Sequence, residues 1–481
     1  MNWNTFANLK FTFPAAAVLF FISMDCCYAE GDFELVSEIR IPSLMKSAQD
    51  LSSLAEKVSP GSSGMVAISV AGLSFSPQMA PFDLTLPIRM LGFSSKKGKL
   101  RTFEWCLVLE RKKNIPMDNR MKGTKEPVYL KEIDGKGMLT YSKTLSESIT
   151  SIPKAEEKEN ESDINIILAL YPGKYFSSFP EGLETFRKEM IQQIMKKSGR
   201  EEEDFNEITF TNIKLGAFEK FLKQCGKFEI DLFFCEESIK LNTEFSPSAG
   251  SPSEKFLESQ KFGGKYQKDI GDSNEIESCG HLKINDDLKS SIMDMTKEVL
   301  VETSDEANPD IPDLFSMLMD KFSGNFKFCM KSFAPGSPIC LEIQASADKQ
   351  KELMAFIASR KNIEDAGNRI FRLKNGSKES KFNFFIVMQK DKIRVVYGKI
   401  GSKYDENIIS SAPSSSGSAP ANNADIYVAA YSKSDKALPL FSSNLNFTEK
   451  TINVNTEIFM EGIKRIIPPE LIKKQQNIDQ E

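Results

Sequence analysis

Residues 225–234 read CGKFEIDLFF, and apolar side chains take alternate positions along this stretch. The alternating residues are Phe228, Ile230, Leu232 and Phe234. A period of two places these side chains on one face of an extended segment and the residues between them on the other face. The stretch therefore predicts a half-buried strand.

A helix is expected directly before this strand. Its apolar residues recur at helical spacing, namely Phe218, Phe221, Leu222 and Cys225. Gly226 follows them, and glycine occupies the left-handed position after a helix without a steric penalty. The sequence thus predicts a helix that ends at Gly226 and leads into a strand.

The same helix, glycine and strand plan recurs twice. One copy carries the stripe Leu314, Phe315, Leu318 and Phe322, followed by Gly324 and a strand from Phe326. The other begins after the cap Ser43, with Leu44, Ala48, Leu51, Ala55 and Val58 as its stripe. There, Gly64 precedes an expected strand at residues 65–70. Each copy is expected to continue into a hairpin.

A longer repeat is visible as well. Residues 163–171 resemble residues 425–431, a displacement of 262 positions, and Gly64 and Gly324 are 260 apart. Residues 103–109 also resemble residues 382–388. We therefore expect two related lobes, 30–262 and 263–481, from an internal duplication with a period of about 260 residues. The alternative is that two unrelated α+β stretches look alike.

The expected fold class is α+β, with antiparallel sheets and helices packed on one face, because the strands follow one another without long crossover connections. Residues 246–253 and 261–278 are interpreted as connectors, and residues 412–423 as a flexible surface loop. Two further helices are predicted, one over residues 183–194 and one over residues 288–299 after the cap Asn285.

Residues 1–29 have the pattern of an export signal. Lys10 precedes an apolar stretch over residues 11–24, which is too short to span a bilayer, and small residues stand at Cys27 and Ala29. Cleavage after Ala29 would release a periplasmic or extracellular protein. A retained membrane anchor is the alternative. No later apolar run reaches transmembrane length, so no integral membrane span is expected in the mature chain.

The charge composition indicates which classes of partner to expect. The 62 basic residues nearly balance the 67 acidic residues, which leaves a net charge of −5 and no large field of one sign. Nucleic acid is therefore not expected as a partner. The expected partner is a protein or an apolar ligand.

Six cysteines follow residue 29, and export permits disulfides. Cys329 and Cys340 are the candidate pair, because a hairpin that pairs residues 332 and 337 places 329 opposite 340. In that arrangement both cysteines point to the less apolar face. The alternative is two ordinary half-buried thiols.

Signals for catalysis or cofactor binding are weak. His281 is the single histidine, so multi-histidine zinc sites are excluded, and neither a GxSxG elbow nor a phosphate-binding glycine loop occurs. Ser43 and Lys46 match an SxxK pattern, yet Ser43 is better explained as a helix cap. Acidic loops at 269–275 and 305–313 lack the ligand spacing of a calcium loop. No catalytic, cofactor-binding or metal-ligating residue is predicted.

These features together predict an exported, non-enzymatic binding or scaffold protein of the cell envelope or extracellular space. One alternative is a periplasmic carrier of apolar molecules, with phenylalanine-rich faces lining a cleft. Another is a histidine-independent hydrolase that uses two carboxylates.

Overall fold

The computed structural model describes 11 main ranges of the chain and a few single residues between them. The ranges are 33–64, 79–97, 100–113, 128–178 without 157 and 159, 221–260, 276–283, 323–330, 337–373, 382–399, 425–431 and 439–466. The chain forms two compact units. Unit 1 takes its residues from 1–179, 228–242 and 457–481, and unit 2 from 180–227 and 243–456.

Unit 1 is built on an antiparallel sheet with the order β4-β5-β3-β2-β1-β6-β7. Its strands are β1 (Phe33–Ile41), β2 (Ile88–Lys97), β3 (Leu100–Glu110), β4 (Tyr129–Ile133), β5 (Lys136–Thr140), β6 (Ile166–Leu170) and β7 (Cys225–Phe234). The strand predicted from the alternation in residues 228–234 is thus confirmed as most of β7.

Unit 2 also holds an antiparallel sheet, with the order β12-β13-β14-β15-β11-β10-β9-β16-β17. Its strands are β9 (Ile276–Lys283), β10 (Ser323–Met330), β11 (Ile339–Gln344), β12 (Ile363–Gly367), β13 (Ile370–Leu373), β14 (Phe382–Met388), β15 (Lys392–Lys399), β16 (Ile426–Tyr431) and β17 (Pro439–Phe447). Two further strands, β8 (Ser238–Pro247) and β18 (Ile452–Phe459), contribute residues to both units, as does β7, whose residues 225–227 belong to unit 2.

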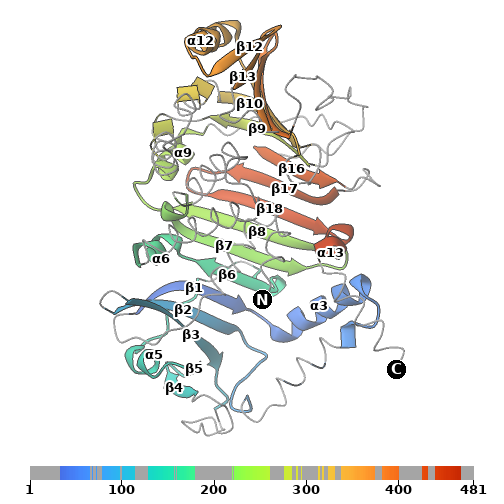
Figure 1. The fold of residues 1–481 in the computed structure, drawn as a ribbon. Coiled ribbons are helices and arrows are strands. Elements are labelled where there is room, and N and C mark those ends of the chain that lie inside the picture. The colour runs from blue at the N-terminus through green and yellow to red at the C-terminus, as the bar shows by residue number, and fades with distance from the viewer. Residues whose placement is uncertain are drawn as a thin grey trace, which may run out of the picture. The chain divides into compact units, whose positions relative to one another are not determined.

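The described part of the chain is therefore rich in antiparallel sheet and contains few helices, as Figure 1 shows. The helices are α3 (Leu44–Val58), α5 (Lys143–Ser148), the 3-10 turn η1 (Glu161–Asp163), α6 (Pro172–Ser178), α9 (Pro252–Ser259), α12 (Ala347–Ala358) and α13 (Met460–Ile466). The prediction of antiparallel sheets with some helices is confirmed at this level.

Strands of the two units pair according to one pattern. β1 lies between β2 and β6, and β9 lies between β10 and β16. Outward on one side the order is β2-β3-β5-β4 in unit 1 and β10-β11-β15-β14 in unit 2. On the other side, β6 pairs with β7 and β16 pairs with β17. Unit 2 adds α12 and the hairpin β12–β13, which lie between β11 and β14 in the chain.

Helices of unit 1 pack on both faces of its sheet, so the expectation of one covered face is wrong there. Leu145 of α5 packs with Leu91 and Cys106. Tyr175 of α6 meets the ring of Phe103, with ring centroids 6.4 Å apart. Leu91 and Phe103 point to opposite faces, because Phe103 is directly opposite Ser94, three residues along β2 from Leu91. Both faces carry apolar side chains, and each needs a cover.

The helix predicted after Ser43 is confirmed as α3. The Ser43 side chain accepts a hydrogen bond from the Lys46 backbone amide, which caps the first turn. The predicted apolar stripe is not the buried line of this helix, however. Ser47 and Leu54 are buried, whereas Leu51 is 36% exposed. The hydroxyl of Ser47 donates to the Asn165 carbonyl oxygen at 2.8 Å, so the buried side of α3 includes a polar contact.

Two local predictions are wrong. Ile68 is helical and 73% exposed, although a strand was expected over residues 65–70. A short apolar run fits a helix as well as a strand, and periodicity alone does not separate the two. Gly226 and Gly324 lie within β7 and β10, not in the left-handed position after a helix. Gly226 instead permits a close approach, since a Cβ there would lie 3.1 Å from the Pro247 carbonyl oxygen.

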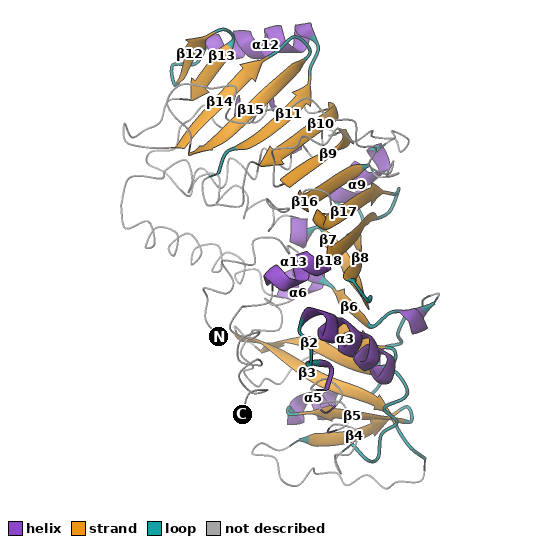
Figure 2. Ribbon diagram, turned by 90° about the vertical axis from the view of Figure 1, so that its right-hand side faces the viewer, coloured by secondary structure: helices purple, strands orange, loops and turns teal. Residues whose placement is uncertain are grey.

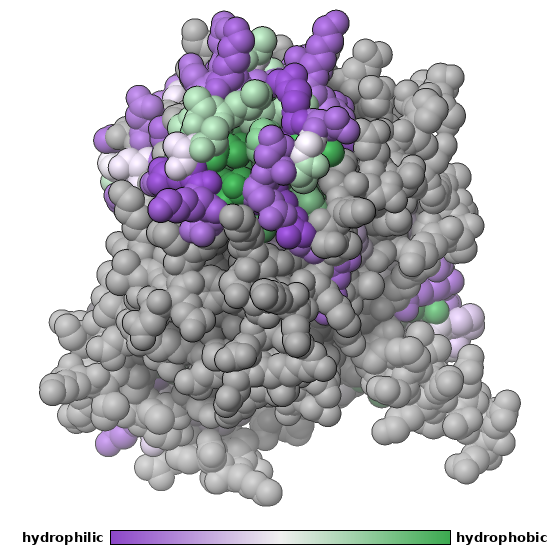
Figure 3. Space-filling view, turned by 45° about the horizontal axis from the view of Figure 1, so that its top comes forward, coloured by the Kyte–Doolittle hydropathy of each residue, from purple (hydrophilic) through white to green (hydrophobic). Residues whose placement is uncertain are grey.

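The core of unit 2 is centred on α12. Leu353 and Ile357 of this helix pack with Phe371, Phe384 and other apolar residues of β12–β15. Figure 2 shows α12 beside these strands, and Figure 3 shows hydrophobic side chains gathered among hydrophilic ones at this end of the unit. A second cluster on the other face of β14 and β15 holds Phe385 and Val396. β14 is therefore buried on both faces, in keeping with its continuous run of apolar residues.

Several predictions lie outside the described residues. They concern the leader at 1–29, the loop at 412–423, the helix at 183–194 and the first part of the polar connector predicted at 261–278. The end of that connector is wrong, because residues 276–278 begin β9. Of the helix at 288–299 the structure describes single residues such as Lys289 and Asp294, which are helical. The connector at 246–253 contains the Ser251 cap and the start of α9.

Candidate functional site

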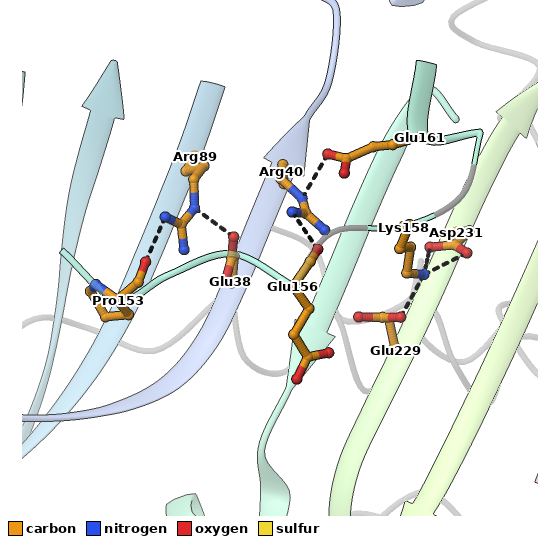
Figure 4. A network of polar contacts seen from close by, with 9 residues as sticks. All are labelled: Glu38, Arg40, Arg89, Pro153, Glu156, Lys158, Glu161, Glu229 and Asp231. Carbon is orange, nitrogen blue, oxygen red and sulfur yellow. Dashed lines mark hydrogen bonds and ion pairs between the residues drawn. The ribbon is translucent and has the colours of Figure 1, made fainter. Parts of the chain in front are cut away.

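One face of the unit 1 sheet carries two rows of residues that include most of its buried charges. Residues directly opposite one another in antiparallel strands share a face. The first row runs Arg89, Arg40, Ile167 and Asp231 across β2, β1, β6 and β7. The second row runs Leu91, Glu38, Ala169 and Glu229 across the same strands. Figure 4 shows the charged members of both rows.

Arg89 and Glu38 form the most buried ion pair of these rows. Nε of Arg89 donates to Oε1 of Glu38 at 2.7 Å. Nη1 of Arg89 donates to the carbonyl oxygen of Pro153, also at 2.7 Å. One guanidinium thus neutralises a carboxylate and satisfies a backbone carbonyl, as its fork of donors allows.

Arg40 has a similar set of partners on the neighbouring strand. Its Nη1 donates to the Glu156 carbonyl oxygen at 2.9 Å, and its Nε lies 3.2 Å from Oε1 of Glu161. Arg40 is directly opposite Arg89, so two guanidinium groups share one row. Their carboxylate and carbonyl partners supply the negative charge and dipoles that this placement requires.

Lys158 joins the two acidic residues of β7. Its Nζ lies 2.5 Å from Oε1 of Glu229, and 2.5 and 2.7 Å from the two carboxylate oxygens of Asp231. Burial raises the pKa of Asp231; the Lys158 ammonium opposes this change and the Glu229 carboxylate adds to it. The network therefore holds three cations and four carboxylates in close contact.

A covering segment, residues 152–161, supplies the partners on the outer side of the rows. Its contacts come in chain order: the Ile152 amide donates to Asp134 at 3.4 Å, the carbonyls of Pro153 and Glu156 accept from the two arginines, and Lys158 reaches β7. Figure 4 shows the segment passing across the strands. Its described residues before η1 form no helix or strand, and hydrogen bonds from Arg89 and Arg40 hold its backbone in place.

The contacts of this network are those of a structural ion-pair network. Glu229 and Asp231 are close enough to be a carboxylate pair, but both accept from the same ammonium. General acid–base catalysis by a carboxylate pair requires that a substrate or a water reach the acids. Here the ammonium of Lys158 occupies the position next to both acids that a substrate or water would need. The arrangement favours structural stabilisation over proton transfer.

Cys329 and Cys340 are placed as the sequence predicts, but they are more deeply buried. They are direct partners in the register of β10 and β11. They also lie on the less apolar face, as predicted, since that face carries the ion pair of Glu342 and Arg394. The alternative of half-buried thiols is wrong, because the two residues are 3% and 1% exposed and pack with Phe385, Val387 and Val396. Phe385 and Val387 belong to β14 and Val396 to β15, which follow β11 in the same sheet, and the hairpin sequence alone does not reveal these neighbours. No disulfide joins these two residues in the structure.

The remaining predicted site residues are spread over the chain. Ser43 caps α3 while Lys46 forms an ion pair with Asp50, so the SxxK residues do not form a nucleophile and base pair. His281 lies within β9, directly opposite Asn325. Asp313, from the acidic loop at 305–313, forms an ion pair with Arg360 at 2.6 Å. Among the described residues no group of three or more His, Cys, Asp or Glu side chains could hold a metal ion.

The charged rows themselves were missed by sequence reasoning. Their signal is present in β1, where Glu38 and Arg40 take alternate positions between buried or half-buried residues. Glu229 and Asp231 take the same alternate positions in β7. A strand whose polar positions are all charged reads as solvated on that face, because the sequence does not show that residues 152–161 return to cover it.

Comparison of the chain with protein-family models, with curated proteins and with solved structures gives no match. No helix in the described part of the chain is both long and apolar enough to cross a membrane.

Proposed function

We propose that this chain is an exported, non-enzymatic binding or scaffold protein of the cell envelope or extracellular space. Its partner would be another protein or an apolar ligand, and the nearly balanced charge of the chain argues against nucleic acid. The proposal rests on the export-type leader and on the way the buried charges are used.

The observation that carries the proposal is the internal pairing of the densest group of charges described in unit 1. Glu38 is paired with Arg89, Arg40 with Glu161, and Lys158 with Glu229 and Asp231. Side chains used for catalysis face a substrate, whereas these face one another and the covering segment. They are suited to keep a sheet rigid, and a rigid sheet is a suitable base for a binding surface.

We further propose that the two lobes, residues 30–262 and 263–481, descend from one duplicated module. The shared pairing pattern around β1 and β9 supports this, and so does the likeness of residues 163–171 to residues 425–431, which contain β6 and β16. The likeness of 103–109 to 382–388 does not support it, because it matches β3 with β14, which have different places in the pattern. An experimental structure in which β1, β2, β3 and β6 fail to superpose on β9, β10, β11 and β16 would contradict the duplication.

The binding proposal is tested with the mature chain. Thermal unfolding is measured with a panel of fatty acids, phospholipids and peptides, and a ligand present at 100 times its Kd is expected to stabilise the fold by about 2.7 kcal/mol. The same protein is assayed with ester, peptide, glycoside and phosphate ester substrates, and no turnover is expected. Turnover that is lost in both Glu229→Gln and Asp231→Asn would overturn the proposal in favour of a two-carboxylate hydrolase.

Export is tested separately, by the mass of the protein from each cell fraction. Cleavage after Ala29 predicts a chain that starts at Glu30 and is recovered outside the cytoplasm. Recovery of the uncleaved chain in the membrane fraction would contradict this part of the proposal without bearing on the binding part.

A further inference from the structure

A pair of thiols lies within the sheet of unit 2. Cys329 of β10 and Cys340 of β11 are direct partners in an antiparallel register. Cα atoms of such partners lie about 4.5 to 5.5 Å apart, and disulfides form between Cα atoms about 4.4 to 6.8 Å apart. No backbone movement is needed to bring the two residues into range.

The two side chains also point toward the same place. Direct partners share a face of the sheet, and both thiols belong to one buried cluster with Phe385, Val387 and Val396. The Cys329 side chain is a hydrogen-bond partner of the Cys340 thiol, which places the two sulfur atoms next to each other. This contact and burial both raise the pKa of Cys340.

We propose that Cys329 and Cys340 are joined by a disulfide when the chain folds in an oxidising compartment. The thiolate of one cysteine attacks a disulfide of the oxidant, a disulfide-bearing protein or small molecule, and forms a mixed disulfide. The second thiolate then displaces the oxidant's sulfur. The two cysteines lose two protons and two electrons, and the oxidant's disulfide is reduced to two thiols.

Burial decides when this reaction takes place. The thiols are 3% and 1% exposed in the folded protein and pack with Phe385, Val387 and Val396 of neighbouring strands, so a bulky oxidant reaches them only before the sheet of unit 2 is complete. Once formed, the bond is protected from reductants by the same side chains. The bond closes a loop of ten intervening residues, which restricts the unfolded chain.

The test is peptide mapping of the wild-type chain produced by export. The protein is unfolded in an alkylating reagent without reductant and digested with trypsin. Residues 328–331 and 332–349 are separate tryptic peptides, and the disulfide joins them. The expected product is this joined pair, two hydrogen atoms lighter than the sum of the free peptides, and reduction must separate it.

Cys106 is the internal control. It is equally buried, but its register partners are Leu91 and Thr140, so it has no cysteine opposite it. Cys106 is expected to be fully alkylated, while Cys329 and Cys340 react only after reduction. Alkylation of all three to the same extent would overturn the proposal.

A thermal measurement gives a second readout. The wild-type chain is unfolded with reductant and refolded in its presence, which is expected to lower its Tm by about 5 °C relative to the oxidised chain, a size typical of a short-loop disulfide. The variant C329S/C340S is expected to show the same Tm with and without reductant. An unchanged Tm of the wild type on reduction would count against the bond, and none of these outcomes depends on the binding function.

Discussion

Arg40 of β1 is directly opposite Arg89 of β2, and each residue is only 5% exposed. Like charges in this position repel each other, and burial removes the water that would screen them. Glu38, Glu161 and the carbonyls of the covering segment surround the two guanidinium groups. The pair of arginines is therefore stable only together with residues 152–161, and this dependence can be measured.

Arg89→Met is expected to lower the free energy of unfolding by about 3 to 5 kcal/mol, because it leaves the Glu38 carboxylate buried without its cation. The double variant Glu38→Leu/Arg89→Met is expected to recover most of this loss. Urea unfolding of the single and double variants measures both effects. Lys143→Met, at the exposed pair with Glu147, is the control and is expected to stay within about 0.5 kcal/mol of the wild type. Additive losses in the double variant would contradict the coupling.

Lys158→Met is expected to release the covering segment, since it removes the single link between residues 152–161 and the acids of β7 that the structure describes. Amide hydrogen exchange should speed up by about tenfold or more in this segment and change little in β1 and β6. Lys154→Met is a matched control, because Lys154 lies in the same segment and is exposed. Equal exchange in the two variants would show that Lys158 does not hold the segment.

Asp231 gives the network a pH dependence of defined sign. Burial raises its pKa in the folded protein above the ordinary value of 3.8, so the folded state takes up a proton more readily than the unfolded state. The contribution of this group to stability therefore increases as the pH falls from above the folded pKa toward 3.8. Asp231→Asn removes this gain. Urea unfolding at several pH values between 7 and 4 should show a difference between variant and wild type that changes with pH, and a constant difference would contradict the assignment.

The contribution of Glu342 in unit 2 to stability depends on pH in the opposite direction to that of Asp231. Burial pushes its pKa up, but the Lys392 hydrogen bond and the Arg394 charge outweigh this and bring the pKa below 4.5. Its stabilising contribution is present above pH 4.5 and is lost as the pH falls through the folded pKa. Glu342→Gln is expected to cost about 3 kcal/mol at pH 7 and to flatten the acid limb of the stability curve. Glu364→Gln, at the more exposed pair with Arg372, is expected to cost no more than about 1 kcal/mol. Equal losses in the two variants would contradict the role of burial.

Gly92 lies in β2 between β1 and β3, directly opposite Ser37 and Trp105. A Cβ at this position would lie 2.2 Å from Oγ of Ser37, 2.7 Å from Phe103 and 2.9 Å from Trp105. Gly92→Ala is therefore expected to destabilise the fold by about 2 kcal/mol or more, as overpacking does. Gly64→Ala is the control, since Gly64 is helical and no atom lies within 4 Å of its Cβ position. The control is expected to be neutral or slightly stabilising, and a neutral Gly92→Ala would show that the strands can move apart.

Local patterns in the sequence predicted several elements correctly. The alternation in residues 228–234 gave β7, and Ser43 with the stripe after it gave α3. The hairpin register that pairs 329 with 340 was also correct. These features depend on neighbours in the chain, and neighbours are what a sequence displays.

The rest depends on contacts between distant residues. Glu38 meets Arg89 across 51 positions, and Lys158 meets Asp231 across 73. The same applies to Cys340, whose burial comes from β14 and β15. The strand predicted over residues 65–70 was wrong for a different reason. A short, mostly apolar run has no feature that separates a strand from a helix.

The two charged rows also restrict how β1 can align with its neighbours. A slip of one residue would turn Glu38 and Arg40 to the side of the sheet that holds Phe103, Trp105 and Tyr175. A purely apolar strand could accept such an error with little penalty, but two unpaired ions among aromatic rings could not. Misaligned sheets of unit 1 are thereby destabilised during folding, and the nascent chain is guided away from traps that lead to aggregation.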